Sequence, residues 1–323
     1  MLHFNLFKKL SLFLLCCSII FSAKAAYIFI PMDESQSNHL KAYGIAFYAI
    51  EREVKVDWLL NYQGGSFMIK QHAAIEDECN IRGVSYQLIA DVQSTQILQS
   101  IASPEVNQDV VRLEKVPKIA IYSPTNKQPW DDAVTLALTY AEIPYEVIYD
   151  EEVLVNLLPL YDWLHLHHED FTGQYGKFYA SFKNATWYKD QKIAYEKLAK
   201  KLGYNKVSEE KLAVAKKIKK FVTAGGFLFA MCSATDSYDI ALANDGNDIC
   251  QHMFDGDAAD PSAEEKLDFS KTLAFKDFTL VKNPNQYEFS SIDATQTRRV
   301  NPKIDFFTLF DFSAKWDPIP TML

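Results

Sequence analysis

The chain has 323 residues, of which 48% are hydrophobic, and it carries a formal net charge of -9 at neutral pH. This apolar content is ample for a packed core, and the length suits one large domain or two modest ones. The acidic balance excludes nucleic acid as an expected partner, because binding to a polyanion requires clustered positive charge.

The amino terminus has the features of a secretory signal. Lys8 and Lys9 precede an apolar run at residues 10–21, and small residues flank Lys24. The run is too short to span a bilayer. We therefore expect residues 1–25 to be a signal peptide, with a retained membrane anchor as the alternative. The protein would then be exported to the periplasm or cell surface and be peripheral to the membrane at most.

Removal of this segment would take away three lysines and no acidic residue, so the formal charge would change from -9 to -12. It would also remove two of the five cysteines and leave Cys79, Cys232 and Cys250. Three cysteines cannot all pair with one another. At least one should therefore be a free thiol even in an oxidising compartment, and the choice of a pair stays open.

Residues 26–113 alternate between predicted strands and helices, which indicates an N-terminal α/β subdomain. Apolar side chains either form short continuous runs or recur at helical spacing. The pattern predicts strands at 27–32, 54–60 and 84–90 and helices at 38–51, 76–81 and 92–102, with a turn at 64–66 and a connection at 104–112.

A second series begins at Pro117, and we expect residues 114–323 to form a second domain. The pattern predicts strands at 118–122, 145–149, 161–167 and 227–231 and helices at 131–141 and 212–224. Such alternation favours an α/β fold with a mostly parallel sheet and helices on both faces. Runs at 273–281 and 306–312 indicate antiparallel additions near the C-terminus, where we expect the domain to be incomplete.

The strand at 227–231 ends on Cys232, directly before small and hydroxyl residues. In a parallel sheet, the turn from the carboxyl end of a strand into the next helix is where ligands bind. The helix N-terminus would favour a thiolate and supply N–H donors to an oxyanion. Cys232 is therefore a predicted nucleophile, and the alternative is a buried cysteine of the core.

The best partners for this thiol lie at the end of the strand at 161–167. That strand is expected beside the strand that ends at Cys232, so we predict His167 or His168 as the base and Glu169 as its orienting acid. His165, His167 and Glu169 would share one strand face, as in half of a metal site. Same-face residues are about 7 Å apart, however, which disfavours direct zinc bonds. A hydrogen-bonded wall of the site and a structural strand end are the other interpretations.

Two further segments allow a functional and a structural interpretation. Asp255, Asp257 and Asp260 could hold calcium, but the spacing lacks the glutamate of a calcium-binding helix–loop–helix, and a solvated loop is favoured. The aromatic residues between 175 and 188 form either a docking loop for carbohydrate or protein or an ordinary cover over the sheet. We expect no bound metal and no cofactor.

The succession of elements from residue 118 to the stretch GGFLFAMCSATDS, at 225–237, resembles the class I glutamine amidotransferase-like fold over residues 118–243. In that family a cysteine stands on a strand-to-helix turn, which matches Cys232. The usual Gly-x-Cys-x-Gly pattern is Ala-Met-Cys-Ser-Ala here, and no His-Pro-Glu follows. The stretches YIFIPMDESQSNHLKAYGIA, DWLHLHHEDFTGQYGKFYASF and GGFLFAMCSATDSYDIALA are similar to exported bacterial proteins labelled asparagine synthetase B.

These resemblances imply a cysteine-dependent amide hydrolase or acyl transferase that acts on a small molecule not identified by the sequence. Synthetase activity is not expected, because the chain lacks the amino-terminal catalytic cysteine and the Ser-Gly-Gly-x-Asp-Ser pyrophosphate loop of the true synthetases. The alternative is a non-catalytic binding or assembly protein of the cell envelope, with another envelope protein as its partner.

Overall fold

The computed structural model describes residues 25–124, 133–293, 303, 313–317, 319 and 321–323. The chain divides into two compact units. Unit 1 comprises Met1–Val116 with Asp311–Leu323, and unit 2 comprises Pro117–Phe310. The predicted signal peptide lies outside the described residues except for its last residue, Ala25.

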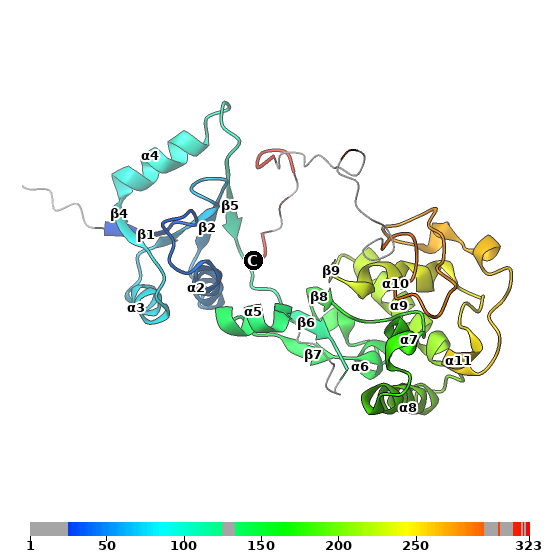
Figure 1. The fold of residues 1–323 in the computed structure, drawn as a ribbon. Coiled ribbons are helices and arrows are strands. Elements are labelled where there is room, and N and C mark those ends of the chain that lie inside the picture. Colours follow the sequence, from blue (N-terminus) through cyan, green and yellow to red (C-terminus); the bar gives the residue numbers. More distant parts are fainter. Residues whose placement is uncertain (1–24, 125–132, 294–302, 304–312, 318, 320) are drawn as a thin grey trace, which may run out of the picture. The chain divides into compact units, whose positions relative to one another are not determined.

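Unit 1 contains a five-stranded sheet in the order β4-β1-β3-β2-β5, in which every neighbouring pair is antiparallel (Figure 1). Its strands are β1 (Ala25–Ile30), β2 (Val56–Leu60), β3 (Ser66–Lys70), β4 (Gln87–Ala90) and β5 (Asp109–Leu113), and its helices are α2 (His39–Glu51), α3 (Ala73–Arg82) and α4 (Asp91–Ile101).

The sheet of unit 1 is antiparallel throughout, whereas the alternation of strands and helices along the chain favours a mostly parallel sheet. Helix α2 does connect two strands of the same direction, β1 and β2, but β3 inserts between them and is antiparallel to both. This is a split βαβ arrangement. The sequence pattern misses β3, which follows β2 through the predicted two-glycine turn. Gly64 is required there because its φ is +78° and a Cβ would lie 2.3 Å from the carbonyl oxygen of Met32.

The two faces of this sheet are buried by different helices. Ile28 and Ile30 of β1 pack with apolar residues of α2 and α3, whereas Phe29 packs on the other face with Ile101 of α4. Alternation of buried residues along β1 thus follows the period of two expected of a strand. Unit 1 has its own hydrophobic core.

Unit 2 contains a four-stranded parallel sheet in the order β7-β6-β8-β9, which confirms the parallel sheet predicted from residue 118 onward. Its strands are β6 (Ile119–Tyr122), β7 (Glu146–Ile148), β8 (Trp163–Leu166) and β9 (Phe227–Ala230). Its helices are α5 (Ala133–Ala141), α6 (Asp150–Leu154), α7 (Tyr179–Phe182), α8 (Thr186–Lys201), α9 (Val207–Thr223), α10 (Ser233–Ala243) and α11 (His252–Asp255), with short 3-10 turns η1 (Leu158–Leu160), η2 (Tyr175–Lys177), η3 (Glu264–Lys266) and η4 (Phe269–Lys271).

Helices cover both faces of this sheet, as predicted. Ala120 and Tyr122 of β6 belong to a core formed with α6, α9 and α10, whereas Ile119 and Ile121 pack on the opposite face with Leu138 of α5. Because β6 lies between β7 and β8, the strand order reverses beside β6. In doubly wound sheets, ligands bind outside the carboxyl ends of the strands at such a point.

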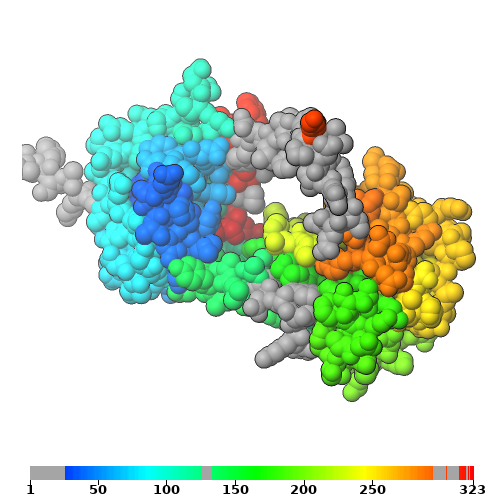
Figure 2. Space-filling view, viewed as in Figure 1, coloured from blue at the N-terminus to red at the C-terminus, as the bar shows by residue number. Residues whose placement is uncertain are grey.

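The C-terminal part of unit 2 differs from the prediction of antiparallel strands. Over 273–281 there is one isolated antiparallel bridge, Leu280 with Ser290, while 306–312 lie outside the described residues. Phe278 and Phe289 pack against α10, and this segment is orange in Figure 2. Among the described residues, none of the helices combines the length and apolar composition that crossing a membrane requires.

Candidate functional site

Cys232 lies at the turn between β9 and α10, where it is the N-cap residue of the helix. Its side chain is exposed, and its backbone has φ 51° and ψ −138°. Positive φ is strained for a residue with a Cβ, and such strain concentrates at functional sites. The turn therefore combines a strained backbone with an exposed thiol.

His167 follows β8 directly beside this turn, because β8 and β9 are parallel neighbours, as predicted. The backbone N–H of Met231 donates to Leu166 O at 2.9 Å, and that of Ala234 donates to His167 O at 3.2 Å. The structure therefore brings the backbone of His167 to the first turn of the helix that begins after Cys232.

The predicted strand at 161–167 ends one residue earlier, at Leu166. His167 and Glu169 thus lie beyond the strand and do not share the strand face of His165. His167 instead stacks on His168, with ring centroids 3.6 Å apart. His168 and Glu169 line a small pocket together with Tyr175 and other residues of the following loop.

The loop after β8 is organised by Asp170. Its carboxylate accepts hydrogen bonds from the backbone of Thr172 at 2.7 Å and of Gly176 at 2.9 Å. Three consecutive residues, those of η2, have φ between +52° and +68°. Burial raises the pKa of Asp170, although these hydrogen bonds oppose the shift. A carboxylate that holds a loop in this way fixes the direction of the side chains that follow.

Lys177 is the last residue of η2, and its side chain is fully buried. Its ammonium donates to the carbonyl oxygens of Val281 at 2.7 Å and Glu288 at 2.6 Å. Burial lowers the pKa of Lys177 to about 8, while nearby Asp170 and Glu288 act in the opposite direction. Lys177 thus joins the loop after β8 to the segment 281–288.

The same segment reaches the first turn of α10. Ser290 Oγ donates to Asp236 Oδ2 at 3.4 Å, and Asp236 lies one helical turn after Cys232. Burial raises the pKa of Asp236 to about 7, and the charge of Asp293 adds to the shift. Tyr287 also belongs here, because burial and then the charge of Cys232 raise its pKa.

Sequence reasoning missed Asp236 and Tyr287 as neighbours of the cysteine, and it missed Lys177 as the residue that fixes the segment of Tyr287. Asp236 stands in the same stretch as Cys232, so an acid on the first turn of the following helix was the available signal. Tyr287 has no comparable signal, since its position follows from contacts of Lys177 and Ser290 between distant parts of the chain.

A buried ionic network lies at the carboxyl ends of β6 and β7, within unit 2. Lys211 of α9 donates to Asp150 Oδ2 at 2.7 Å and to the hydroxyls of Tyr122 and Tyr149, both at 2.9 Å. Burial raises the pKa of the adjacent Glu210 to about 8, because Asp150 adds to the shift and Lys211 only partly offsets it. Such a network fixes α9 against the sheet, since every partner is desolvated.

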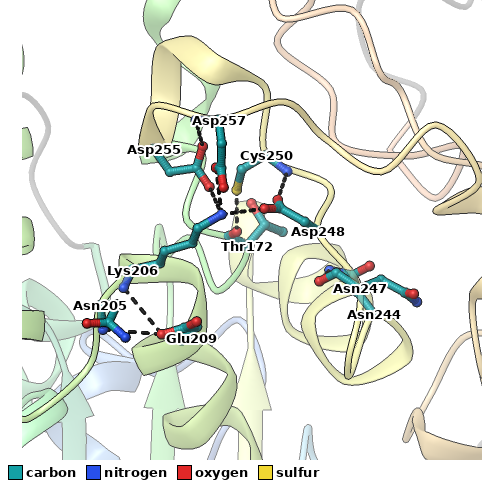
Figure 3. A network of polar contacts seen from close by, with 10 residues as sticks. All are labelled: Thr172, Asn205, Lys206, Glu209, Asn244, Asn247, Asp248, Cys250, Asp255 and Asp257. Carbon is teal, nitrogen blue, oxygen red and sulfur yellow. Dashed lines mark hydrogen bonds and ion pairs between the residues drawn. The ribbon is translucent and has the colours of Figure 1, made fainter.

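The acidic group considered for calcium is occupied by a lysine (Figure 3). Lys206 Nζ lies 2.9 Å from Asp255 and 2.6 Å from Asp257, and it also pairs with Asp248, while Asp260 pairs with Lys266. Three potential ligands, Asp248, Cys250 and Asp255, lie within 4.8 Å of one another. Lys206 Nζ pairs with three of these carboxylates and offsets one of their three charges, so the group is an ion-pair network in the structure.

The three described cysteines are all free thiols, and they differ in environment. Cys79 and Cys250 are buried, whereas Cys232 is exposed. Burial raises the pKa of Cys79 to about 12 and that of Cys250 well above its ordinary value. Among these thiols, only the one at the strained turn is open to a reagent.

Comparison of the chain with protein-family models, with curated proteins and with solved structures gave no match.

Proposed function

We propose that unit 2 is a cysteine-dependent amide hydrolase or acyl transferase with Cys232 as its nucleophile. The observation that carries this proposal is the conformation of Cys232, which combines an exposed thiol with φ 51° on the turn from a parallel strand into a helix. A backbone strain of this kind costs of order 1–3 kcal/mol, and it persists where the surrounding structure imposes it.

We further propose that unit 2 has the class I glutamine amidotransferase-like fold. Its parallel sheet, the reversal of strand order beside β6 and the cysteine after β9 support this assignment. Ala230 and Ala234 replace the usual flanking glycines. The positive φ at Cys232 supports an elbow despite these replacements, because the sharp turn needs the cysteine itself to adopt that conformation.

In the proposed reaction, the thiol proton of Cys232 passes to the imidazole of His167 or His168, and the sulfur attacks the carbonyl carbon of an amide. The amine leaves with a proton returned by the imidazole, and water or another acceptor then cleaves the thioester. Ala234 N–H already donates to His167 O, so Ser233 N–H is the helix amide proposed to stabilise the oxyanion. Glu169 is proposed to orient the imidazole.

The test is the rate at which each thiol reacts with iodoacetamide in the native protein, followed by peptide mass spectrometry. We expect Cys232 to react at least about 100-fold faster than Cys79 and Cys250, since thiolate fraction and access govern the rate. Cys250→Ser is the matched control and should leave the labelling of Cys232 unchanged. Slow labelling of Cys232 that requires denaturant would contradict a nucleophilic role.

The alternative is a non-catalytic binding or assembly protein of the cell envelope that keeps this fold. In either case we propose that the protein is exported, on the strength of the signal-like sequence at 1–25. A fast Cys232 without turnover of any amide or ester, together with capture of one specific envelope protein, would favour this alternative.

A further inference from the structure

Four aromatic rings from separate segments of unit 2 form one continuous group, here termed the aromatic cluster. The ring of Phe178 lies 6.0 Å from Phe182, 5.9 Å from Trp187 and 5.7 Å from Tyr287, measured between centroids. Phe182 and Trp187 are themselves 5.1 Å apart. None of the four is fully buried, and Phe182 is 40% exposed.

Two sets of contacts link this cluster to the first turn of α10, and the charge of Cys232 acts on Tyr287. Lys177, the residue before Phe178, holds the carbonyl oxygens of Val281 and Glu288 on either side of Tyr287. Ser290, three residues after Tyr287, donates to Asp236 on the first turn of α10. The cluster and the exposed thiol are therefore joined through a short, hydrogen-bonded segment.

The charges around this junction select against an anion. Asp293, Asp236 and Glu288 all act on Tyr287 by their charge, and the buried ammonium of Lys177 is engaged by the two carbonyls. Aromatic faces also carry partial negative charge, so they repel carboxylates and favour other rings in offset or edge contacts. The surface thus suits an uncharged aromatic group.

We propose that the aromatic cluster binds an uncharged aromatic group of the substrate whose carbonyl reacts at Cys232. This inference rests on the proposed function for the identity of the nucleophile, but it concerns a separate surface. It gives residues 178–187 a role in substrate binding. The other interpretation of these residues is a cover over the sheet that binds nothing.

The first experiment compares two alkylating probes that share one reactive group, iodoacetamide and N-phenyl iodoacetamide. The ratio of their rates at Cys232, divided by the same ratio for glutathione, isolates binding of the phenyl ring from thiol reactivity. We expect this corrected ratio to be about 5 to 10, in line with the energy of an aromatic contact. Replacement of the phenyl group by 4-carboxyphenyl should abolish the preference.

Phe182→Leu and Trp187→Leu should each lower the corrected ratio by about threefold and leave the rate with iodoacetamide unchanged. The matched control is Phe227→Leu, which changes an exposed phenylalanine at the opposite end of β9 and should keep the ratio of the wild type. A corrected ratio of 1 in the wild type, or one that is equal in all variants, would overturn the proposal.

A second measurement needs no reaction at Cys232. Titration of the Cys232→Ala variant with acetanilide, followed by tryptophan fluorescence, should give saturable binding that Phe182→Leu weakens. Absence of saturable binding would overturn the role of the aromatic cluster. If acetanilide binds but Cys232 reacts slowly with both probes, the cluster is upheld as an aromatic-binding surface and the nucleophilic role fails.

Discussion

The backbone at Cys232 makes a residue-scale prediction that is independent of any reaction. Glycine adopts positive φ without steric cost, whereas alanine retains the strain of a Cβ. Cys232→Gly should therefore be more stable than Cys232→Ala, by about 1 kcal/mol, although glycine is ordinarily the less stable of the two. Urea denaturation of both variants measures the difference.

A matched control lies two residues away. Ala230 is the last residue of β9, where the backbone is extended, so Ala230→Gly should destabilise the protein by roughly 0.5–1 kcal/mol. Equal stability of the two Cys232 variants, or a less stable glycine variant, would mean that the turn is not strained.

The same residue illustrates what local sequence patterns can predict. The position of Cys232 after an apolar strand, and that strand's place beside the one before His167, follow from periodicity and turn residues, and both are confirmed. The neighbours Tyr287 and Asp236 could not be predicted as a group. Their proximity depends on a buried lysine and on serine hydrogen bonds between segments that are distant in the chain.

At the scale of elements, Lys177 connects the loop after β8 to the segment at 278–291. Lys177→Met keeps the apolar part of the side chain but leaves the carbonyls of Val281 and Glu288 without their donor. We expect a loss of about 3 kcal/mol, because hydrogen bonds to a charged group and unsatisfied buried carbonyls each contribute. Hydrogen exchange should accelerate at the amides of 278–291.

Lys183→Met, which changes an exposed lysine in the same region, is the control and should have little effect on that exchange. The pH dependence gives a second check. Since the pKa of Lys177 is lowered from 10.5 to about 8, the unfolded chain binds more protons between these values, and stability rises with pH there. Lys177→Met should lose that slope. A variant with unaltered exchange would show that the segment is held by other contacts.

The direction of neighbouring strands could be predicted where one helix connects them. It could not be predicted where a hairpin strand lies between them. In unit 2 each crossover joins parallel strands, as the alternation indicates. In unit 1 the same alternation surrounds β3, which is only five residues long and follows a tight turn. The insertion of β3 between β1 and β2 makes the sheet antiparallel. The sequence pattern identifies elements one at a time, so it does not show which strands become neighbours.

At the scale of the whole molecule, each unit has its own core. The sequence pattern does not show which charged residues are buried in these cores. Helix α9 carries four lysines between residues 216 and 220. Lys211 and Glu210 are nevertheless fully buried at its amino-terminal end, because Asp150 and two tyrosine hydroxyls meet them there. Asp150 balances the charge of Lys211, whereas one carboxyl oxygen of Glu210 is buried without a hydrogen bond.

This buried pair gives unit 2 a pH-dependent stability. The pKa of Glu210 is raised from 4.5 to about 8, so between these values the folded protein retains a proton that the unfolded chain releases. The free energy of unfolding must then fall as pH rises through that range, by about 1.4 kcal/mol for each unit of pKa difference at most. Glu210→Gln removes the titrating group and preserves its size.

We therefore expect the difference in stability between Glu210→Gln and the wild type to grow in favour of the variant from pH 5 to pH 8. Urea denaturation at pH 5, 6.5 and 8 measures it. Glu209→Gln is the matched control, because Glu209 is exposed and its oxygen still accepts from the backbone of Asn205 as an amide. A parallel pH dependence in all three proteins would mean that Glu210 is ionised in the folded state, and that the Lys211 ammonium then balances two buried carboxylates rather than one.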